Sequence, residues 1–144
     1  MKKLLLLFIL FAALNTSAQA ADVLFTTITT QNVGDNLKFE TNLPMFNKDQ
    51  YILKVDWGNG TLVSYTLNGT GGGAWGLGNA TEGKTIGTKT VKIYAESTTK
   101  LAVLYIANNP ATSIKMEASC KDIVSIDAEN CKLTTIDVAG CEAL

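Results

Sequence analysis

Residues 122–141, DIVSIDAENC followed by KLTTIDVAGC, contain one ten-residue pattern twice in succession. Each copy has the order Ile-Asp-apolar, at residues 126–128 and 136–138, and each ends in a cysteine, Cys131 or Cys141. Apolar side chains at every second position predict a β-strand with one buried face. Because the pattern recurs at a short, fixed interval, the sequence predicts strands that stack on one another as repeating units.

The same pattern extends backwards over LAVLYIANN at residues 101–109 and ATSIKMEASC at residues 111–120. Steps of 10, 12 and 10 residues separate the apolar pairs, which are Leu104/Ile106, Ile114/Met116, Ile126/Ala128 and Ile136/Val138. Together the four units resemble the leucine-rich repeat, L-x-x-L-x-L-x-x-[NC], in the short form found in bacterial surface proteins. The resemblance implies a solenoid over residues 99–144 whose parallel strands are centred on Tyr105, Lys115, Asp127 and Asp137.

The resemblance also implies a structural role for one corner residue of each unit, namely Asn109, Cys120, Cys131 and Cys141. In leucine-rich repeats this side chain packs inward and satisfies backbone groups of the neighbouring coil. Three cysteines in an exported chain also suggest a disulfide, and that alternative stays open beside the preferred interpretation of free structural thiols. A zinc site is disfavoured, because the chain has no histidine and no paired cysteine spacing.

Upstream, residues 21–98 consist of short β-branched and aromatic segments separated by turn residues, which predicts a small antiparallel β-sandwich. Its last predicted strand, TVKIYAE at residues 90–96, lies thirteen residues ahead of the first repeat pair. This strand is therefore expected to begin the solenoid, so that the sandwich caps the repeats at their N-terminal end. The whole plan resembles exported bacterial leucine-rich-repeat proteins that are broadly comparable to internalins.

One turn of this sandwich carries a second resemblance. The sequence VDWGNGT, residues 55–61, is similar to the aromatic strand and D-x-G-[DN]-G turn of polycystic-kidney-disease-type (PKD-like) domains. Asp56 is expected to cap the turn through backbone hydrogen bonds, while Gly58 and Gly60 supply positive φ angles. The alternative is that Asp56 and Asn59 bind Ca²⁺.

The first twenty residues have the composition of a secretory signal peptide. Lys2 and Lys3 precede an apolar run that is too short to span a bilayer, and an A-x-A cleavage site ends at Ala20. Cleavage after Ala20 predicts an exported protein, secreted or held at the cell surface. No later segment is apolar enough to predict a transmembrane span.

A phosphate-binding pattern, G-x-x-x-x-G-K-[ST], is matched by GNATEGKT at residues 78–85. Such a loop binds phosphate where a buried strand precedes it and a helix follows it. Here a glycine-rich segment from Gly69 precedes the motif and an alternating strand follows it, so nucleotide binding is not expected. Lys84 is predicted in an exposed loop or at a strand start. The G-x-G-x-x-G match at residues 71–76 fails for the same reason.

The composition argues against several classes of function. The formal net charge is −1, and it falls to −3 once Lys2 and Lys3 leave with the signal peptide. A mildly acidic chain without a basic cluster is not expected to bind nucleic acid or anionic lipid. Without histidine, Ser-His-Asp and Cys-His mechanisms are excluded, and no cofactor or metal site is expected.

The outward side chains of the repeat strands form the predicted ligand-binding face. The candidate residues are Tyr105, Lys115, Glu117, Asp127, Glu129 and Asp137. Adjacent strands lie about 4.8 Å apart, so Asp127 and Asp137 are expected to be neighbours, as the two carboxylates of a retaining glycosidase are. Acids exposed on a flat sheet have no pocket that would raise a pKa, so recognition is preferred and no catalytic residue is assigned.

These observations predict an exported, non-catalytic binding or adhesion protein whose solenoid face recognises a protein or glycan partner. The alternative is a carbohydrate-active enzyme, or the accessory carbohydrate-binding module of one. The sequence CEAL at residues 141–144 begins a further unit without a polar cap, so the repeats are expected to continue beyond it.

Overall fold

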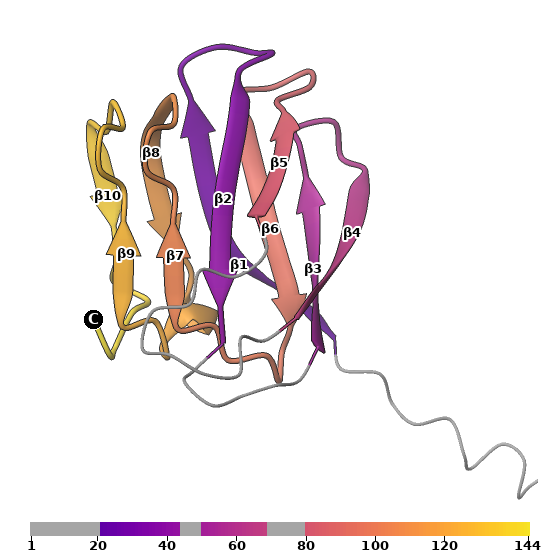
Figure 1. Ribbon diagram of the computed structural model, residues 1–144, viewed down its shortest axis with the longest axis vertical. Coiled ribbons are helices and arrows are strands. Elements are labelled where there is room, and N and C mark those ends of the chain that lie inside the picture. Colours follow the sequence, from indigo (N-terminus) through magenta and orange to yellow (C-terminus); the bar gives the residue numbers. More distant parts are fainter. Residues whose placement is uncertain (1–20, 44–49, 69–79) are drawn as a thin grey trace, which may run out of the picture.

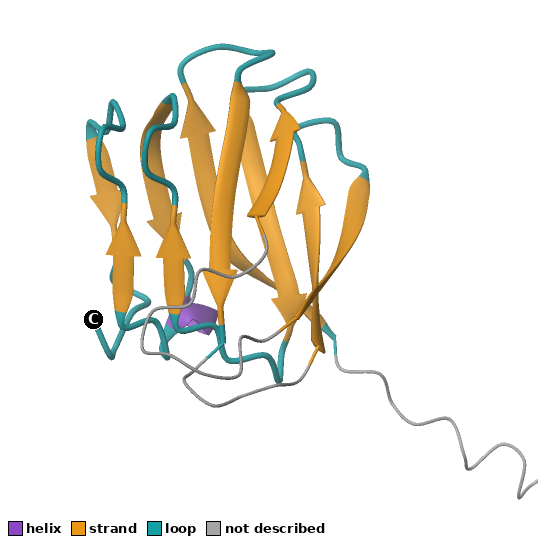
Figure 2. Ribbon diagram, in the orientation of Figure 1, coloured by secondary structure: helices purple, strands orange, loops and turns teal. Residues whose placement is uncertain are grey.

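The computed structural model, drawn in Figures 1 and 2, describes residues 21–43, 50–68 and 80–144. These residues are almost entirely strands and turns, so the prediction of a mainly-β fold is confirmed. The predicted signal peptide and the glycine-rich segment with its G-x-G-x-x-G match lie outside the described residues.

Two sheets face each other across a shared core (Figure 1). Sheet A has the strand order β10-β8-β1-β6-β3-β4, and sheet B has the order β5-β2-β7-β9. The strands are β1 (Asp22–Thr30), β2 (Asn36–Asn42), β3 (Gln50–Asp56), β4 (Leu62–Asn68), β5 (Ala80–Lys84), β6 (Thr90–Glu96), β7 (Val103–Tyr105), β8 (Ala111–Met116), β9 (Ser125–Asp127) and β10 (Thr135–Asp137). A short 3₁₀ helix, η1 (Ala118–Cys120), follows β8.

Among β1 to β6, every pairing is antiparallel, as predicted for the sandwich. Alternating side chains decide which face of each strand is buried. In β2, for example, Leu37 and Phe39 are fully buried while Lys38 faces outward. The inward side chains of sheet A, such as Leu53 and Ile93, meet those of sheet B in one apolar core.

The four repeat units do not stack consecutively, and this part of the prediction is wrong. β7 and β9 pair in parallel within sheet B, whereas β8 and β10 pair in parallel within sheet A. The chain therefore winds from one sheet to the other and back. Each turn of this winding takes 22 residues, because Leu104 pairs with Ile126 and Ile114 pairs with Ile136. We call residues 101–122 coil 1 and residues 123–144 coil 2.

Coil 1 continues the two sheets of the sandwich directly. β7 pairs antiparallel with β2, and β8 pairs antiparallel with β1. The expectation that the strand at residues 90–96 begins the solenoid is wrong, because β6 lies between β1 and β3 in sheet A. The coils are thus attached through the two edge strands nearest to them, one in each sheet. In the described parts of the chain, no helix is long and apolar enough to span a membrane.

Candidate functional site

The residues of the phosphate-binding pattern have structural partners. The last five residues of the motif that precede Thr85 form β5, so a strand stands where a phosphate loop would be. An added Cβ on Gly83 would lie 2.5 Å from the indole ring of Trp57, so this position needs glycine to let the ring pack. The Thr85 hydroxyl donates to the Asn32 carbonyl at 3.1 Å and accepts from the Gly34 amide at 2.8 Å.

Lys84 is exposed at the end of β5, and not at a strand start. No helix follows it, because the chain continues through a turn into β6. The geometry therefore lacks the helix N-terminus that a bound phosphate requires.

The turn after β3 is held by its own side chains. Asp56 Oδ1 accepts hydrogen bonds from the amides of Gly58 at 2.8 Å and Gly60 at 2.9 Å. Gly58 has φ +106° and Gly60 has φ +79°. Asn59 Oδ1 accepts from the Thr61 amide at 3.0 Å. Both side-chain oxygens that were considered as Ca²⁺ ligands thus accept backbone hydrogen bonds within the turn. Among the described residues, no cluster of three acidic, cysteine or histidine side chains is placed to hold a metal ion.

The corner residues join neighbouring layers of the structure. Asn109 Nδ2 donates to the carbonyls of Lys38, Ile106 and Ala107, at 2.7, 2.7 and 2.9 Å, and Asn109 Oδ1 accepts from the Lys38 amide at 2.7 Å. Twenty-two residues later, the thiol of Cys131 donates to the Ile106 carbonyl at 3.1 Å. These bonds tie coil 1 to β2 and coil 2 to coil 1.

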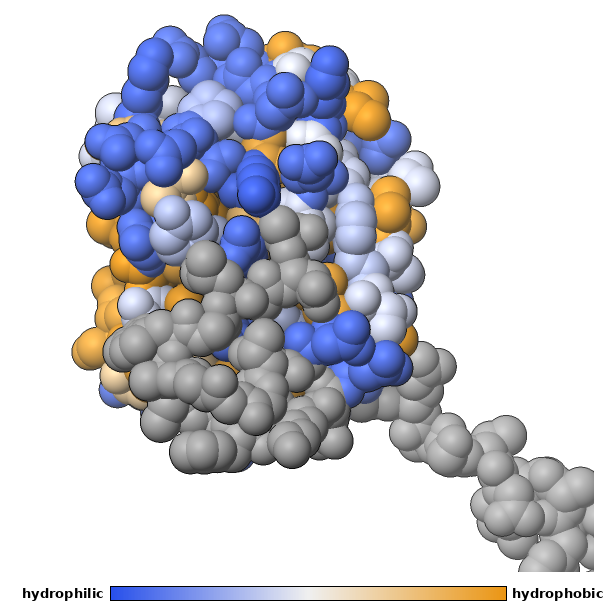
Figure 3. Space-filling model, in the orientation of Figure 1, coloured by the Kyte–Doolittle hydropathy of each residue, from blue (hydrophilic) through white to orange (hydrophobic). Residues whose placement is uncertain are grey.

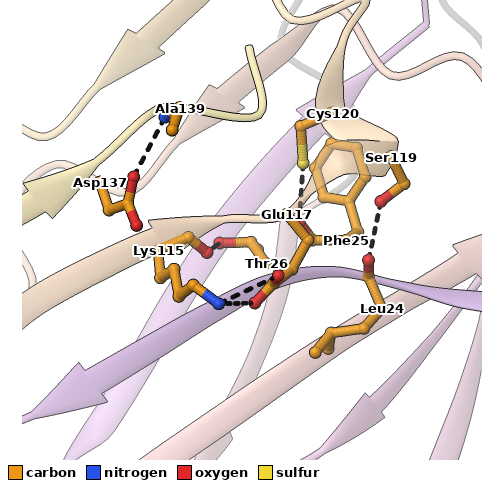
Figure 4. Close-up of polar contacts among 9 residues, drawn as sticks. All are labelled: Leu24, Phe25, Thr26, Lys115, Glu117, Ser119, Cys120, Asp137 and Ala139. Atoms are coloured by element: carbon orange, nitrogen blue, oxygen red, sulfur yellow. Dashed lines mark hydrogen bonds and ion pairs between the residues drawn. The ribbon is translucent and has the colours of Figure 1, made fainter.

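Cys120 has the same role on the side of sheet A. Its buried thiol donates to the Phe25 carbonyl at 2.7 Å, and the neighbouring Ser119 hydroxyl donates to the Leu24 carbonyl at 2.7 Å (Figure 4). Burial raises the pKa of Cys120 to about 12 and also raises that of Cys141. Cys120, Cys131 and Cys141 are all free thiols.

The six candidate ligand-binding residues separate into two groups on opposite faces of the molecule. Tyr105, Asp127 and Glu129 belong to sheet B and the turn after it. The other three, Lys115, Glu117 and Asp137, belong to sheet A and the turns after its strands. The expected single column is therefore wrong. Asp127 is the parallel neighbour of Tyr105 and Asp137 is the parallel neighbour of Lys115, so the two aspartates are not neighbours.

The group on sheet A is occupied with itself. Lys115 Nζ lies 2.9 Å from Glu117 Oε1 and 3.1 Å from Glu117 Oε2, while Asp137 Oδ1 accepts from the Ala139 amide at 3.1 Å (Figure 4). The hydrogen bond to Glu117 is the main cause that raises the pKa of Lys115, and the charges of Glu117 and Asp137 add to it. Because this pair is exposed, it contributes little to stability.

The group on sheet B surrounds a hollow. Tyr105 is half-buried, and it pairs with Glu40 of β2 on one side and Asp127 of β9 on the other. A cavity of about 310 Å³ adjoins the tyrosine, and its lining residues are Lys38, Glu40, Tyr105, Ala107, Asn108 and Asn109. A second hollow of about 380 Å³ continues along β2 towards β5. The upper part of this face is predominantly hydrophilic in Figure 3.

Charges of both signs line this hollow. Lys38 Nζ lies 3.9 Å from Glu40 Oε1, and the Glu40 side chain is only 12% exposed. Glu40 Oε2 is buried and has no hydrogen-bond partner. Asp127 Oδ1 accepts from the Glu129 amide at 3.0 Å, which fixes the turn beside Tyr105. A carboxylate oxygen without a donor makes the hollow suited to a ligand that carries hydroxyl or N–H groups.

Sequence reasoning missed Lys38, Glu40 and Asn108. The first two were assigned to the sandwich, and nothing in the local pattern indicates that β2 lies beside β7. The positive φ of Asn108, +59°, was indicated by the Asn-Asn pair at residues 108–109 and was not used. Comparison with known proteins gives no further guidance, because no family model, no curated protein and no solved structure matches this chain.

Proposed function

We propose that this chain is an exported binding protein whose recognition surface is the outer face of sheet B around Tyr105. The supporting observation is that Tyr105 lies in register between Glu40 and Asp127, beside a hollow of about 310 Å³. An aromatic side chain buries a large area at low entropic cost, which suits it to anchor a partner. The flanking carboxylates and Lys38 then set the orientation and the specificity of the contact.

The partner is a protein or a glycan at the cell surface. A sugar ring offers an apolar face to Tyr105 and hydroxyl donors to the carboxylates, and a peptide offers amide donors in the same place. Export through the N-terminal signal brings the face to such partners. The general plan of bacterial leucine-rich-repeat surface proteins with a PKD-like domain belongs to this proposal. The recurrence of an inward polar or thiol side chain at Asn109 and Cys131 supports it.

The proposal is tested by screening the full chain on arrays of glycans and of surface proteins, followed by affinity measurements on any partner found. Tyr105→Ala is expected to weaken binding about tenfold or more, because it removes the anchor. Tyr94→Ala is the matched control, since Tyr94 is a half-buried tyrosine on the outer face of sheet A. If both variants bind the partner as tightly as the parent chain, this face is not the recognition surface.

The non-catalytic part of the proposal is tested on the glycans themselves. Incubation with the pure chain is expected to leave their reducing ends unchanged, because the two aspartates considered for catalysis lie in different sheets. Hydrolysis that is lost in Asp127→Asn would instead favour the carbohydrate-active enzyme.

A further inference from the structure

One end of the molecule is formed by two strand edges that lie side by side. β9 is the last strand of sheet B and β10 is the last strand of sheet A, and both lie at the same end (Figure 1). Apolar atoms reach the surface along this end of the molecule in Figure 3. Within the described chain, neither sheet has a strand beyond this pair. We call this surface, made by β9 and β10 with the inward side chains behind them, the open end.

Equivalent residues in the two coils differ in exposure. Ile114 of coil 1 is 1% exposed, whereas its partner Ile136 in coil 2 is 50% exposed. Likewise, Leu104 is fully buried whereas Ile126 is only partly buried. Both pairs point into the core and occupy the same positions of the coil. The difference arises because coil 2 covers coil 1, and no described residue covers coil 2 in the same way.

The contact between the coils repeats backbone groups at a 22-residue interval. The carbonyls of Ala102 and Thr112 accept from the amides of Val124 and Thr134, each at 2.8 Å. In the other direction, the Ile106 amide donates to the Asp127 carbonyl at 2.7 Å. Twenty-two residues further on, the groups that correspond are the carbonyls of Val124 and Thr134 and the amide of Ala128.

The turn between the sheets follows the same interval. The Asn108 amide donates to the Glu129 carbonyl at 2.8 Å, and Asn130 Nδ2 donates to Asn108 Oδ1 at 3.1 Å. Asn108 and Asn130 also share a positive φ, +59° and +55°. Coil 2 therefore presents a copy of the surface that coil 1 uses to hold coil 2.

We propose that the open end receives a third coil with the same 22-residue pattern, joined in tandem and stacked in parallel register. Its inward positions carry apolar residues over Ile126 and Ile136, and its corner carries an amide or a thiol over Cys131. Its outward residues above Asp127 and Asp137 are not acidic, because like charges on adjacent strands repel each other. This inference concerns a different surface from the Tyr105 face and does not depend on its function.

Charge argues for this occupant over a second copy of the chain. Coil 2 has one lysine, Lys132, against four acidic residues, Asp127, Glu129, Asp137 and Glu142. Two copies that met through their open ends would bring these acids together, and such juxtaposition is unfavourable. Coil 1 shows the alternative, because it places Tyr105 beside Asp127 and Lys115 beside Asp137.

The test adds a copy of residues 101–122 after Leu144 of the full chain and measures amide hydrogen exchange in β9 and β10. The added coil is expected to slow exchange in both strands by about tenfold or more, because it pairs their open edges. The matched control carries lysine in the added copy at the positions of Leu104 and Ile114, and it is expected to exchange as the parent chain does.

A second variant makes the result independent of how well the added coil folds by itself. Ile136→Lys is expected to leave the parent chain folded, since this side chain is half exposed, and to abolish the protection that the added coil gives β10. The proposal is overturned if exchange in both strands is the same with and without the added coil. It is also overturned if the parent chain protects these strands by forming a dimer at high concentration, which sedimentation would detect.

Discussion

At the scale of single residues, the motif most suggestive of an activity is explained by packing. Gly83 and Thr85 match a phosphate loop in sequence, yet Gly83 lies against the indole of Trp57 and Thr85 bonds to the turn after β1. Trp57 is 5% exposed, and its Nε1 donates to the Tyr65 hydroxyl at 3.1 Å. A glycine before a lysine can therefore be required by an aromatic side chain that is distant in sequence.

Gly83→Ala is expected to lower the free energy of unfolding by about 1–3 kcal/mol, because the new methyl group overlaps the Trp57 ring. Urea denaturation gives the free energy, and near-ultraviolet circular dichroism reports the displaced ring. Lys84→Ala is the control, and it is expected to stay within about 0.5 kcal/mol of the parent chain since Lys84 is exposed. Equal stability of the two variants would show that the indole contact does not constrain this position.

At the scale of elements, the coils depend on bonds that side chains make to backbone groups of the preceding layer. Asn109 is 7% exposed and makes four such bonds, two of which go to Lys38 of β2. The thiols of Cys120 and Cys131 bond in the same manner to the layers before them. Short strands of three residues, such as β7 and β9, need this support because their own ladders are brief.

Asn109→Ala is expected to cost about 2–4 kcal/mol in the free energy of unfolding, because several buried backbone groups lose their partner at once. Asn109→Asp keeps the shape and the bond to the Lys38 amide, yet it sets a carboxylate against three carbonyls, so a loss at least as large is expected. Thermal and urea denaturation measure both variants. A well-tolerated Asn109→Asp would mean that the site needs the shape of the side chain and not its donors.

At the scale of the whole molecule, the two parts expected as separate domains share both sheets and one core. The predicted boundary near residue 98 falls between β6 and β7, but β7 pairs with β2 and β8 pairs with β1. Phe39 of the sandwich and Leu104 of coil 1 belong to the same cluster of buried residues. Such continuity favours cooperative unfolding of the whole chain.

Leu104→Ala is expected to cost about 2–5 kcal/mol and to lower the stability of the sandwich together with that of the coils. Hydrogen exchange of β6 and β7, followed through a urea titration, measures both parts in one experiment. The two strands are expected to lose protection at the same urea concentration. If β6 keeps its protection after β7 has lost it, the coils unfold as a separate unit.

The sequence by itself determined the strand content, the alternation of each strand and the corner residues, because these depend on local periodicity and turn chemistry. It also determined the turn at Asp56, whose hydrogen bonds span four residues or fewer. Only the tertiary structure decided which strands are neighbours. A period of about eleven residues fits both a stack of four strands on one face and a coil of 22 residues that crosses between two sheets. The second arrangement is selected because coil 1 extends the edges of β1 and β2 at once, and this placed Tyr105 beside Glu40 and separated Asp127 from Asp137.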